Sequence, residues 1–211
     1  MKRIASLLSI FAMMFCLSCS QSNANGENKS NNNKNNTEMN TQKEKVLVVF
    51  FSQAGEQYSV GNIEVGNTKI VADYICKYIG CNQFEIKAEK DYNMPYMKLI
   101  EVAKAETKSG ELPAYKGKVE NIDQYETIFI GGPVWWGTYP QVMFTFFKDY
   151  DLNGKTIIPF TTHEGSGLAS CVDDVKKAYP KANVLNGFSM YGHDVRTGEK
   201  KVIEWLKKLG F

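Results

Sequence analysis

Hydroxyl and amide side chains gather where an apolar run gives way to a helical segment. Ser52 and Gln53 follow the apolar run, and Asn67 and Thr68 open the helical segment. Such side chains, together with the free backbone N–H groups of a helix N-terminus, bind anions. A phosphate monoester would be held there without Lys or Arg. The alternative is ordinary capping of the helix by Asn67 or Thr68.

A second segment has two adjacent tryptophans among glycines and prolines. Residues 131–140 read Gly-Gly-Pro-Val-Trp-Trp-Gly-Thr-Tyr-Pro. Trp135 and Trp136 cannot both point into the core, and exposing either one costs apolar hydration. A flat aromatic ligand would cover them. The alternatives are a partner-binding patch or simple packing over the edge of a sheet.

A third segment, residues 161–167, reads Thr-Thr-His-Glu-Gly-Ser-Gly. Its glycines let the backbone approach a ligand closely. His163 and Glu164 suggest acid–base chemistry or a metal site. The chain has only two histidines, however, and the other is His193, far along the sequence. We therefore expect no metal site.

Alternating strands and helices position these segments. Apolar runs rich in β-formers predict buried strands, and apolar residues at helical spacing predict helices. Strands are expected at 46–51, 83–87, 127–130, 156–160 and 184–190, and helices at 67–80, 95–107, 140–148, 168–179 and 197–209. This alternation predicts an α/β domain from residue 45 to 211, with a parallel sheet and helices on both faces.

The chemistry is expected beyond the carboxyl ends of the strands, where all three segments begin. One residue conflicts with the strand assignments. Pro159 lies inside the expected strand 156–160, where its missing N–H would break a ladder hydrogen bond. A proline is tolerated there only near the end of a strand or at a bulge.

The N-terminus predicts export and a membrane anchor. Lys2 and Arg3 precede a mostly apolar stretch that is too short to span a bilayer, as in a signal peptide over residues 1–18. Cys19 follows a small residue, as at a bacterial lipoprotein cleavage site, although Cys16 occupies a position where an aliphatic residue is usual. We expect a lipid on Cys19; the alternative is a secretory signal with an incidental cysteine. Residues 19–44, rich in Asn, Ser, Lys and Gln, are expected to form a flexible tether.

Charge and cysteine content narrow the function classes. Apart from Lys2 and Arg3, basic and acidic residues are equal in number, so nothing indicates nucleic-acid binding. Export would allow a disulfide between Cys76 and Cys81, but two buried free thiols are at least as good a reading of the sequence. No cysteine pair has the spacing of a zinc site.

Together, the three segments resemble the flavodoxin family. The resemblance covers residues 45–211 in order and spacing: Phe-Phe-Ser after the first strand, Gly-Asn-Thr at the first helix, and the segments at 131–140 and 161–167. It implies a flavodoxin-like three-layer sandwich, with a five-stranded parallel sheet in the order 2-1-3-4-5, and FMN as the cofactor.

The resemblance also implies roles for individual residues. Ser52, Gln53, Asn67 and Thr68 would hold the phosphate. Trp136 would lie against one face of the isoalloxazine ring, and Gly137 would offer its carbonyl near the flavin N5. The implied FMN-binding residues are Ser52, Gln53, Asn67, Thr68, Pro133, Val134, Trp135, Trp136, Gly137, Thr162, His163, Gly165, Ser166 and Gly167.

The chain departs from the family pattern in three ways. About a dozen residues, 54–65, are inserted in the phosphate loop, either over the ribityl chain or as a lid. Thr138 stands where many flavodoxins have an acid. The third segment lacks the aromatic residue that often covers the other face of the ring. A substrate would have room to stack on that uncovered face.

The expected function is therefore that of a monomeric electron carrier without catalytic residues, since FMN does the chemistry for unidentified redox partner proteins. The alternative is an FMN-dependent NAD(P)H:quinone-type oxidoreductase. The fold hosts both activities, and the absence of a separate dinucleotide fingerprint favours the carrier only weakly. A third class, a binding lipoprotein that has lost FMN, is disfavoured by the intact phosphate and tryptophan segments.

Overall fold

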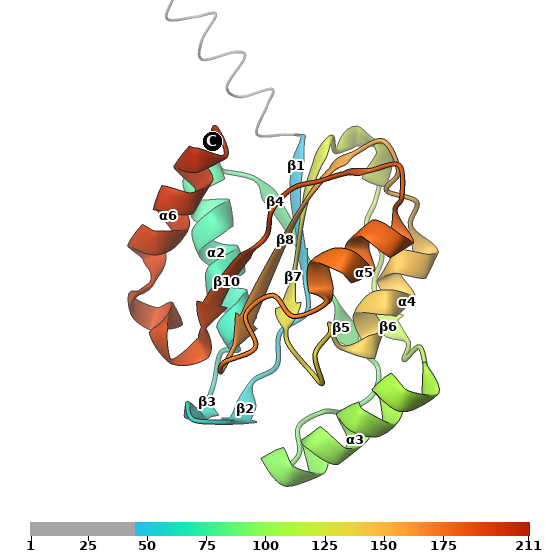
Figure 1. Ribbon diagram of the computed structural model, residues 1–211, viewed down its shortest axis with the longest axis vertical. Coiled ribbons are helices and arrows are strands. Elements are labelled where there is room, and N and C mark those ends of the chain that lie inside the picture. Colours follow the sequence, from blue (N-terminus) through green and yellow to red (C-terminus); the bar gives the residue numbers. More distant parts are fainter. Residues whose placement is uncertain (1–44) are drawn as a thin grey trace, which may run out of the picture.

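The computed structural model describes residues 45–211 as a sheet with helices on both faces (Figure 1). The strands of the main sheet are β1 (Val46–Phe50), β4 (Asn82–Glu85), β7 (Thr127–Pro133), β8 (Thr156–His163), β9 (Asn183–Val184) and β10 (Phe188–Tyr191). The α-helices are α2 (Asn67–Ile79), α3 (Tyr96–Ser109), α4 (Gln141–Asp149), α5 (Cys171–Ala178) and α6 (Glu199–Lys208). Two short antiparallel pairs complete the strands of this region: the hairpin of β2 (Gly55–Gln57) with β3 (Gly61–Ile63), and β5 (Lys87–Ala88) with β6 (Tyr115–Lys116), which are separated in sequence by α3.

The strands of the main sheet are parallel and run in the order β10-β8-β7-β1-β4. From the β4 edge this is the expected order 2-1-3-4-5. The expected fifth strand, 184–190, is instead divided into β9 and β10, which both pair with β8, so the sheet has six strands.

Two apolar layers hold the helices to the sheet. On one face, Val48 and Phe50 of β1 pack against α2 and α6. On the other, Leu47 and Val49 pack with residues of α3, α4 and α5. Alternate residues of β1 point to opposite faces, and all five are buried, as expected for a strand covered on both sides. The expected three-layer sandwich is confirmed.

Strands β7 and β8 extend three residues beyond their expected ends. Gly131, Gly132 and Pro133 pair with β8, although the sequence analysis placed them in a loop. The glycines are needed because side chains cross them: a Cβ at Gly131 would lie 2.0 Å from Cζ of Phe160. The Gly-Gly pair therefore permits packing within the sheet.

Pro159 lies well inside β8 and pairs with Ile130 of β7. On the other side of β8, Leu185 donates its N–H to the Ile157 carbonyl, and pairing with β10 resumes at Phe160. Since backbone groups alternate along a strand, the position of the missing N–H of Pro159 faces the break between β9 and β10. The proline therefore costs no ladder hydrogen bond. Its position opposite the break also explains why the expected fifth strand is divided into β9 and β10.

None of the helices in residues 45–211 has the length and apolar character needed to cross a membrane. In the same region, no three metal-ligating side chains lie close enough together to hold an ion. The expected signal peptide, the lipidated Cys19 and the tether lie outside the described residues.

Candidate functional site

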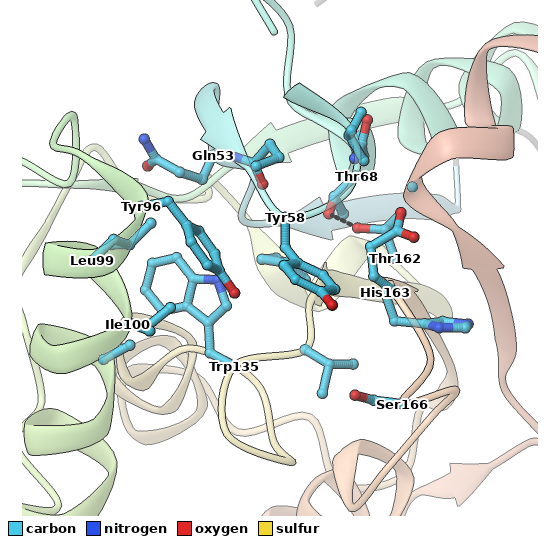
Figure 2. Close-up of a pocket in the computed structure, with 18 of the residues that line it drawn as sticks. Gln53, Tyr58, Thr68, Tyr96, Leu99, Ile100, Trp135, Thr162, His163 and Ser166 are labelled. Atoms are coloured by element: carbon cyan, nitrogen blue, oxygen red, sulfur yellow. Dashed lines mark hydrogen bonds between the residues drawn. The ribbon is translucent and has the colours of Figure 1, made fainter. Parts of the chain in front are cut away.

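A cavity of about 390 Å³ lies beyond the carboxyl ends of β1, β7 and β8 (Figure 2). Helix α2 begins at the edge of this cavity, and α3 and the β2–β3 hairpin form one of its walls. Of the residues expected to bind FMN, those that line it are Gln53, Asn67, Thr68, Pro133, Val134, Trp135, Trp136, Gly137, Thr162, His163 and Ser166. Ser52, Gly165 and Gly167 do not line the cavity. Other lining residues, not expected from the sequence, are Gln57, Tyr58, Val60, Tyr96, Leu99, Ile100, Ala103, Glu164 and Gly192.

The N-terminus of α2 forms the polar end of the cavity. Ser52 Oγ accepts the N–H of Lys69 at 3.0 Å, so this serine satisfies the helix itself. Within the described residues, the N–H groups of Asn67 and Thr68 have no acceptor. Gly66 lets the two segments approach, because a Cβ there would lie 2.2 Å from Ser52 Oγ and 2.7 Å from the Gln53 carbonyl oxygen. Two free donors at a helix N-terminus suit an anion.

A buried hydrogen bond joins this end to the third segment. Thr68 Oγ1 and Thr162 Oγ1 lie 2.7 Å apart, and the dashed line in Figure 2 marks the contact. Each hydroxyl has one proton and two acceptor sites. When Thr162 donates, Thr68 keeps its own proton for a ligand.

Arg196 is a residue that the sequence analysis missed. Its Nη1 donates to Oδ1 of Asn67 at 3.2 Å, and its Nη2 lies 3.5 Å from the Val65 carbonyl oxygen. This arginine, the only one in residues 45–211, places a permanent positive charge beside the start of α2. Its rarity in the sequence could have marked Arg196 as a candidate site residue. Its place beside Asn67 could not be read from the sequence, because the two residues are 129 positions apart.

The two tryptophans occupy different environments. Trp135 packs edge-on against Phe51 and Tyr92, with ring centroids 5.5 and 5.2 Å away. Trp136 is 51% exposed, and its Nε1 donates to the Ile100 carbonyl of α3 at 2.8 Å. The Lys104 ammonium lies 4.9 Å from the centre of the Trp136 ring. Both tryptophans line the cavity, but Trp136 is also tied to α3.

The tryptophans are held by a tight turn. Trp135 and Thr138 exchange both backbone hydrogen bonds, and Trp136 and Gly137 between them have φ values of 52° and 82°. Two left-handed residues make this a type I′ turn. Trp136 is one of four described non-glycine residues with positive φ, a conformation that side chains rarely adopt.

The carbonyl of Gly137, expected near the flavin N5, is bonded to another element in this structure. It accepts the backbone N–H of Ser170 at 3.0 Å. The Ser170 hydroxyl lies 2.8 Å from the same carbonyl and 2.6 Å from Oδ2 of Asp174, and its one proton bonds to one of these two oxygens. Thr138 Oγ1 donates to Oδ2 of Asp174 at 2.7 Å. These bonds come from a tertiary contact between Gly137 and the start of α5, which the spacing of residues in the sequence did not reveal. Thr138, noted because many relatives carry an acid there, thus bonds to an acid from another element.

The inserted residues 54–65 form the β2–β3 hairpin, which is attached to α3. Glu56 Oε2 accepts the N–H of Tyr96 at 2.8 Å, at the N-terminus of α3. Tyr58, at the hairpin tip, stacks on Tyr96 with ring centroids 6.0 Å apart and 28° between the planes. In Figure 2, Tyr58 lies between Tyr96 and Trp135 on one side and Thr162 and His163 on the other. The insertion therefore contributes an aromatic ring to the cavity.

The third segment supplies polar groups and a histidine. His163 Nδ1 accepts the N–H of Gly165 at 2.9 Å, and its ring lies 4.5 Å from that of Tyr191. Burial lowers the pKa of His163; the nearby His193 lowers it further and Glu164 opposes the shift. Glu164, the neighbour of His163 in the chain, accepts the backbone N–H of His193 at 2.9 Å. The fold therefore brings together two histidines that are distant in sequence.

Together, the fold and the cavity define a class of α/β protein that binds a phosphorylated aromatic ligand at the carboxyl edge of its sheet. The flavodoxin family model matches residues 45–209, and the chain belongs to that family. A search of curated proteins gave no match.

Solved structures show the same fold. A provisionally assigned flavoprotein from Bacteroides eggerthii is 29% identical, with a TM-score of 0.64 over 79% of this chain and 98% of that one. A second, from Bacteroides uniformis, is 26% identical, with a TM-score of 0.64 over 78% and 98%. A Lactobacillus acidophilus flavoprotein solved in complex with FMN is 22% identical, with a TM-score of 0.54 over 76% and 99%. FMN is the cofactor that membership of this family supports.

Proposed function

We propose that this protein is an electron carrier that binds FMN and is anchored by a lipid outside the cytoplasm. The observation that carries the proposal is the junction of two unlike surfaces in one cavity. One end offers the N–H groups of Asn67 and Thr68, which have no acceptor among residues 45–211, and aromatic rings line part of the rest. A phosphorylated flat ring is complementary to both.

The phosphate end fits a phosphate monoester. The N–H groups of Asn67 and Thr68 and the Thr68 hydroxyl would donate to its oxygens. Arg196 adds a full positive charge and holds the amide of Asn67 in place.

The aromatic end fits the ring. Trp135 and Trp136 line one part of the cavity, and Tyr58 of the hairpin, stacked on Tyr96, adds a further ring to its lining. Leu99 and Ile100 of α3 add apolar side chains to the same lining. When bound, FMN supplies the redox chemistry, while the protein's residues bind it, orient it and limit its access.

A single experiment separates the carrier from the alternative. The intact protein, purified in detergent and loaded with FMN, is mixed anaerobically with NADH or NADPH, and a quinone is added afterwards. A carrier stays oxidised with either nucleotide but accepts electrons from a flavoprotein reductase. Rapid bleaching by a nucleotide, followed by quinone turnover, would identify an FMN-dependent NAD(P)H:quinone-type oxidoreductase instead.

One observation favours that second function. Tyr58 and Trp136 line the cavity and are 59% and 51% exposed, and the wall beside them is apolar. A flat apolar acceptor would find stacking partners at this opening. The same experiment decides, because a carrier and a reductase differ in direct reaction with the nucleotide.

The anchor has its own test. The signal-like residues 1–18 and Cys19 support lipidation, and the polar residues 19–44 would separate the lipid from the folded part. Growth with a clickable fatty acid labels the wild-type chain in the membrane fraction. The Cys19→Ser variant is expected to remain unlabelled; equal labelling would refute the anchor.

A further inference from the structure

The thiols of Cys76 and Cys81 are in contact at the C-terminal end of α2. Their sulfur atoms lie 3.6 Å apart, within a thiol hydrogen bond, and are not joined by a disulfide. A disulfide requires about 2.05 Å between the sulfurs, so a small side-chain movement would close the gap. Both cysteines are partly exposed, whereas the other described cysteine, Cys171, is fully buried.

The cap of α2 creates this contact. Gly80 has φ 78° and donates its N–H to the Cys76 carbonyl at 2.7 Å, which ends the helix in a left-handed turn. Turns of this kind bring side chains on the two sides of the glycine together. Two cysteines occupy positions that usually hold apolar side chains, and they lie at the opposite end of α2 from Asn67 and Thr68.

We propose that Cys76 and Cys81 form a reversible intramolecular disulfide that fastens the end of α2 to the start of β4. The oxidant is a disulfide of the thiol-exchange class, such as oxidised glutathione. This site is separate from the cavity and does not depend on FMN.

The reaction is two thiol–disulfide exchanges. The Cys81 thiolate attacks one sulfur of the oxidant and releases a thiolate, which leaves a mixed disulfide on Cys81. Cys76 then loses its proton and attacks Cys81 Sγ, releasing the second thiolate. Two protein thiols and one small disulfide become one protein disulfide and two small thiols.

The hydrogen bond between the two thiols affects their pKa values in opposite directions. The bond between the two thiols lowers the pKa of Cys81 and raises the pKa of Cys76, which burial raises further. Asp73 also raises the pKa of Cys76, and Lys69 opposes it. The thiolate is the reactive form, so this bond favours a first attack by Cys81, and a first attack by Cys76 would give the same disulfide.

Peptide mapping tests the proposal directly. Trypsin cleaves after Lys77, between the two cysteines, so a disulfide would link peptides 70–77 and 78–87. The intact protein is equilibrated with reduced or oxidised glutathione, alkylated, digested and analysed by mass spectrometry. We expect the linked pair after oxidation and two alkylated peptides after reduction.

Two variants and a stability measurement complete the test. Cys76→Ser abolishes the linked pair, whereas Cys171→Ala leaves it intact. Oxidation is expected to raise the Tm of the wild type by about 5 °C, as a short closed loop constrains the unfolded chain, and to leave that of Cys76→Ser unchanged. Separate alkylation of Cys76 and Cys81 after oxidation, or glutathione retained on Cys81 without closure, would overturn the proposal.

Discussion

Thr68 Oγ1 and Thr162 Oγ1 form a 2.7 Å hydrogen bond that joins the start of α2 to the end of β8. The bond is buried and connects residues 94 positions apart. It therefore holds the phosphate end of the cavity against the third segment, and the free proton of the pair is available to a ligand.

Removing the Thr68 hydroxyl should weaken the binding of FMN more than the binding of riboflavin. Thr68→Ala is expected to weaken FMN binding about tenfold and riboflavin binding much less, because only FMN has the phosphate that the hydroxyl would bond. Flavin fluorescence quenching measures both affinities. Thr68→Ser, which keeps the hydroxyl, is the matched control. Equal losses for the two ligands would place the phosphate elsewhere.

Arg196 should contribute to the same discrimination through its charge. Arg196→Met is expected to weaken FMN about tenfold and to flatten the dependence of FMN affinity on salt, because a positive charge is lost beside the helix N-terminus. Titrations at low and high ionic strength measure both effects. Lys77→Met removes a cation from the far end of α2 and should change neither. An unchanged salt dependence in Arg196→Met would contradict the role.

Tyr58 should act on the ring and not on the phosphate. Tyr58→Ala is expected to weaken FMN and riboflavin alike, by about three- to tenfold, since stacking contributes about 0.5–1.5 kcal/mol. Tyr58→Phe should bind both normally. Tyr78→Ala, which removes an exposed tyrosine from α2, is the control for a general effect of losing a surface ring. A loss confined to FMN would show that Tyr58 does not cover the ring.

Gly66 should be intolerant of a side chain. A Cβ in Gly66→Ala would meet both Ser52 Oγ and the Gln53 carbonyl oxygen, so the first segment must move away from α2. We expect a loss of about 1–3 kcal/mol in unfolding free energy and more than tenfold weaker FMN binding. Urea unfolding and flavin titration measure these. Adding Ser52→Ala removes the clash with the Ser52 side chain but not the clash with the Gln53 carbonyl, so it should restore part of the lost stability and affinity. Wild-type FMN affinity in Gly66→Ala would refute the close approach.

His163 should make stability depend on pH. Because burial lowers its folded pKa, the unfolded state binds more protons between that value and the usual value of about 6.5. The stabilisation is therefore complete above about pH 6.5 and is lost as the pH falls through this window. Melting at pH 7.5 and 5.5 should show a smaller decrease in Tm for His163→Gln than for the wild type. Equal decreases would exclude His163 as the cause.

Local sequence patterns were sufficient for most of the architecture. The five apolar residues of β1 predicted a strand covered on both faces, because a sheet between two helical layers leaves no polar side. Helix α2 was recognised by its spacing and by Gly80 at its end. Patterns of this kind depend only on neighbours in the chain, and they also marked the three segments at the carboxyl edge.

Long-range contacts decided the rest. Gly131 reads as a loop residue until Phe160 lies across it, and Pro159 reads as a strand breaker until the break between β9 and β10 is seen. The Gly137 carbonyl reads as free until Ser170 bonds to it. In each case the partner comes from another element, and no local pattern encodes its position.

The sequence by itself thus determined the α/β class, the flavodoxin resemblance and the side-chain types of the site. Only the tertiary structure decided that Arg196 lies beside Asn67, that Tyr58 of the insertion enters the cavity, and that Trp136 is tied to α3. The physical reason is that chain periodicity specifies which face of an element is buried. The identity of the partner across that face depends on how the elements pack.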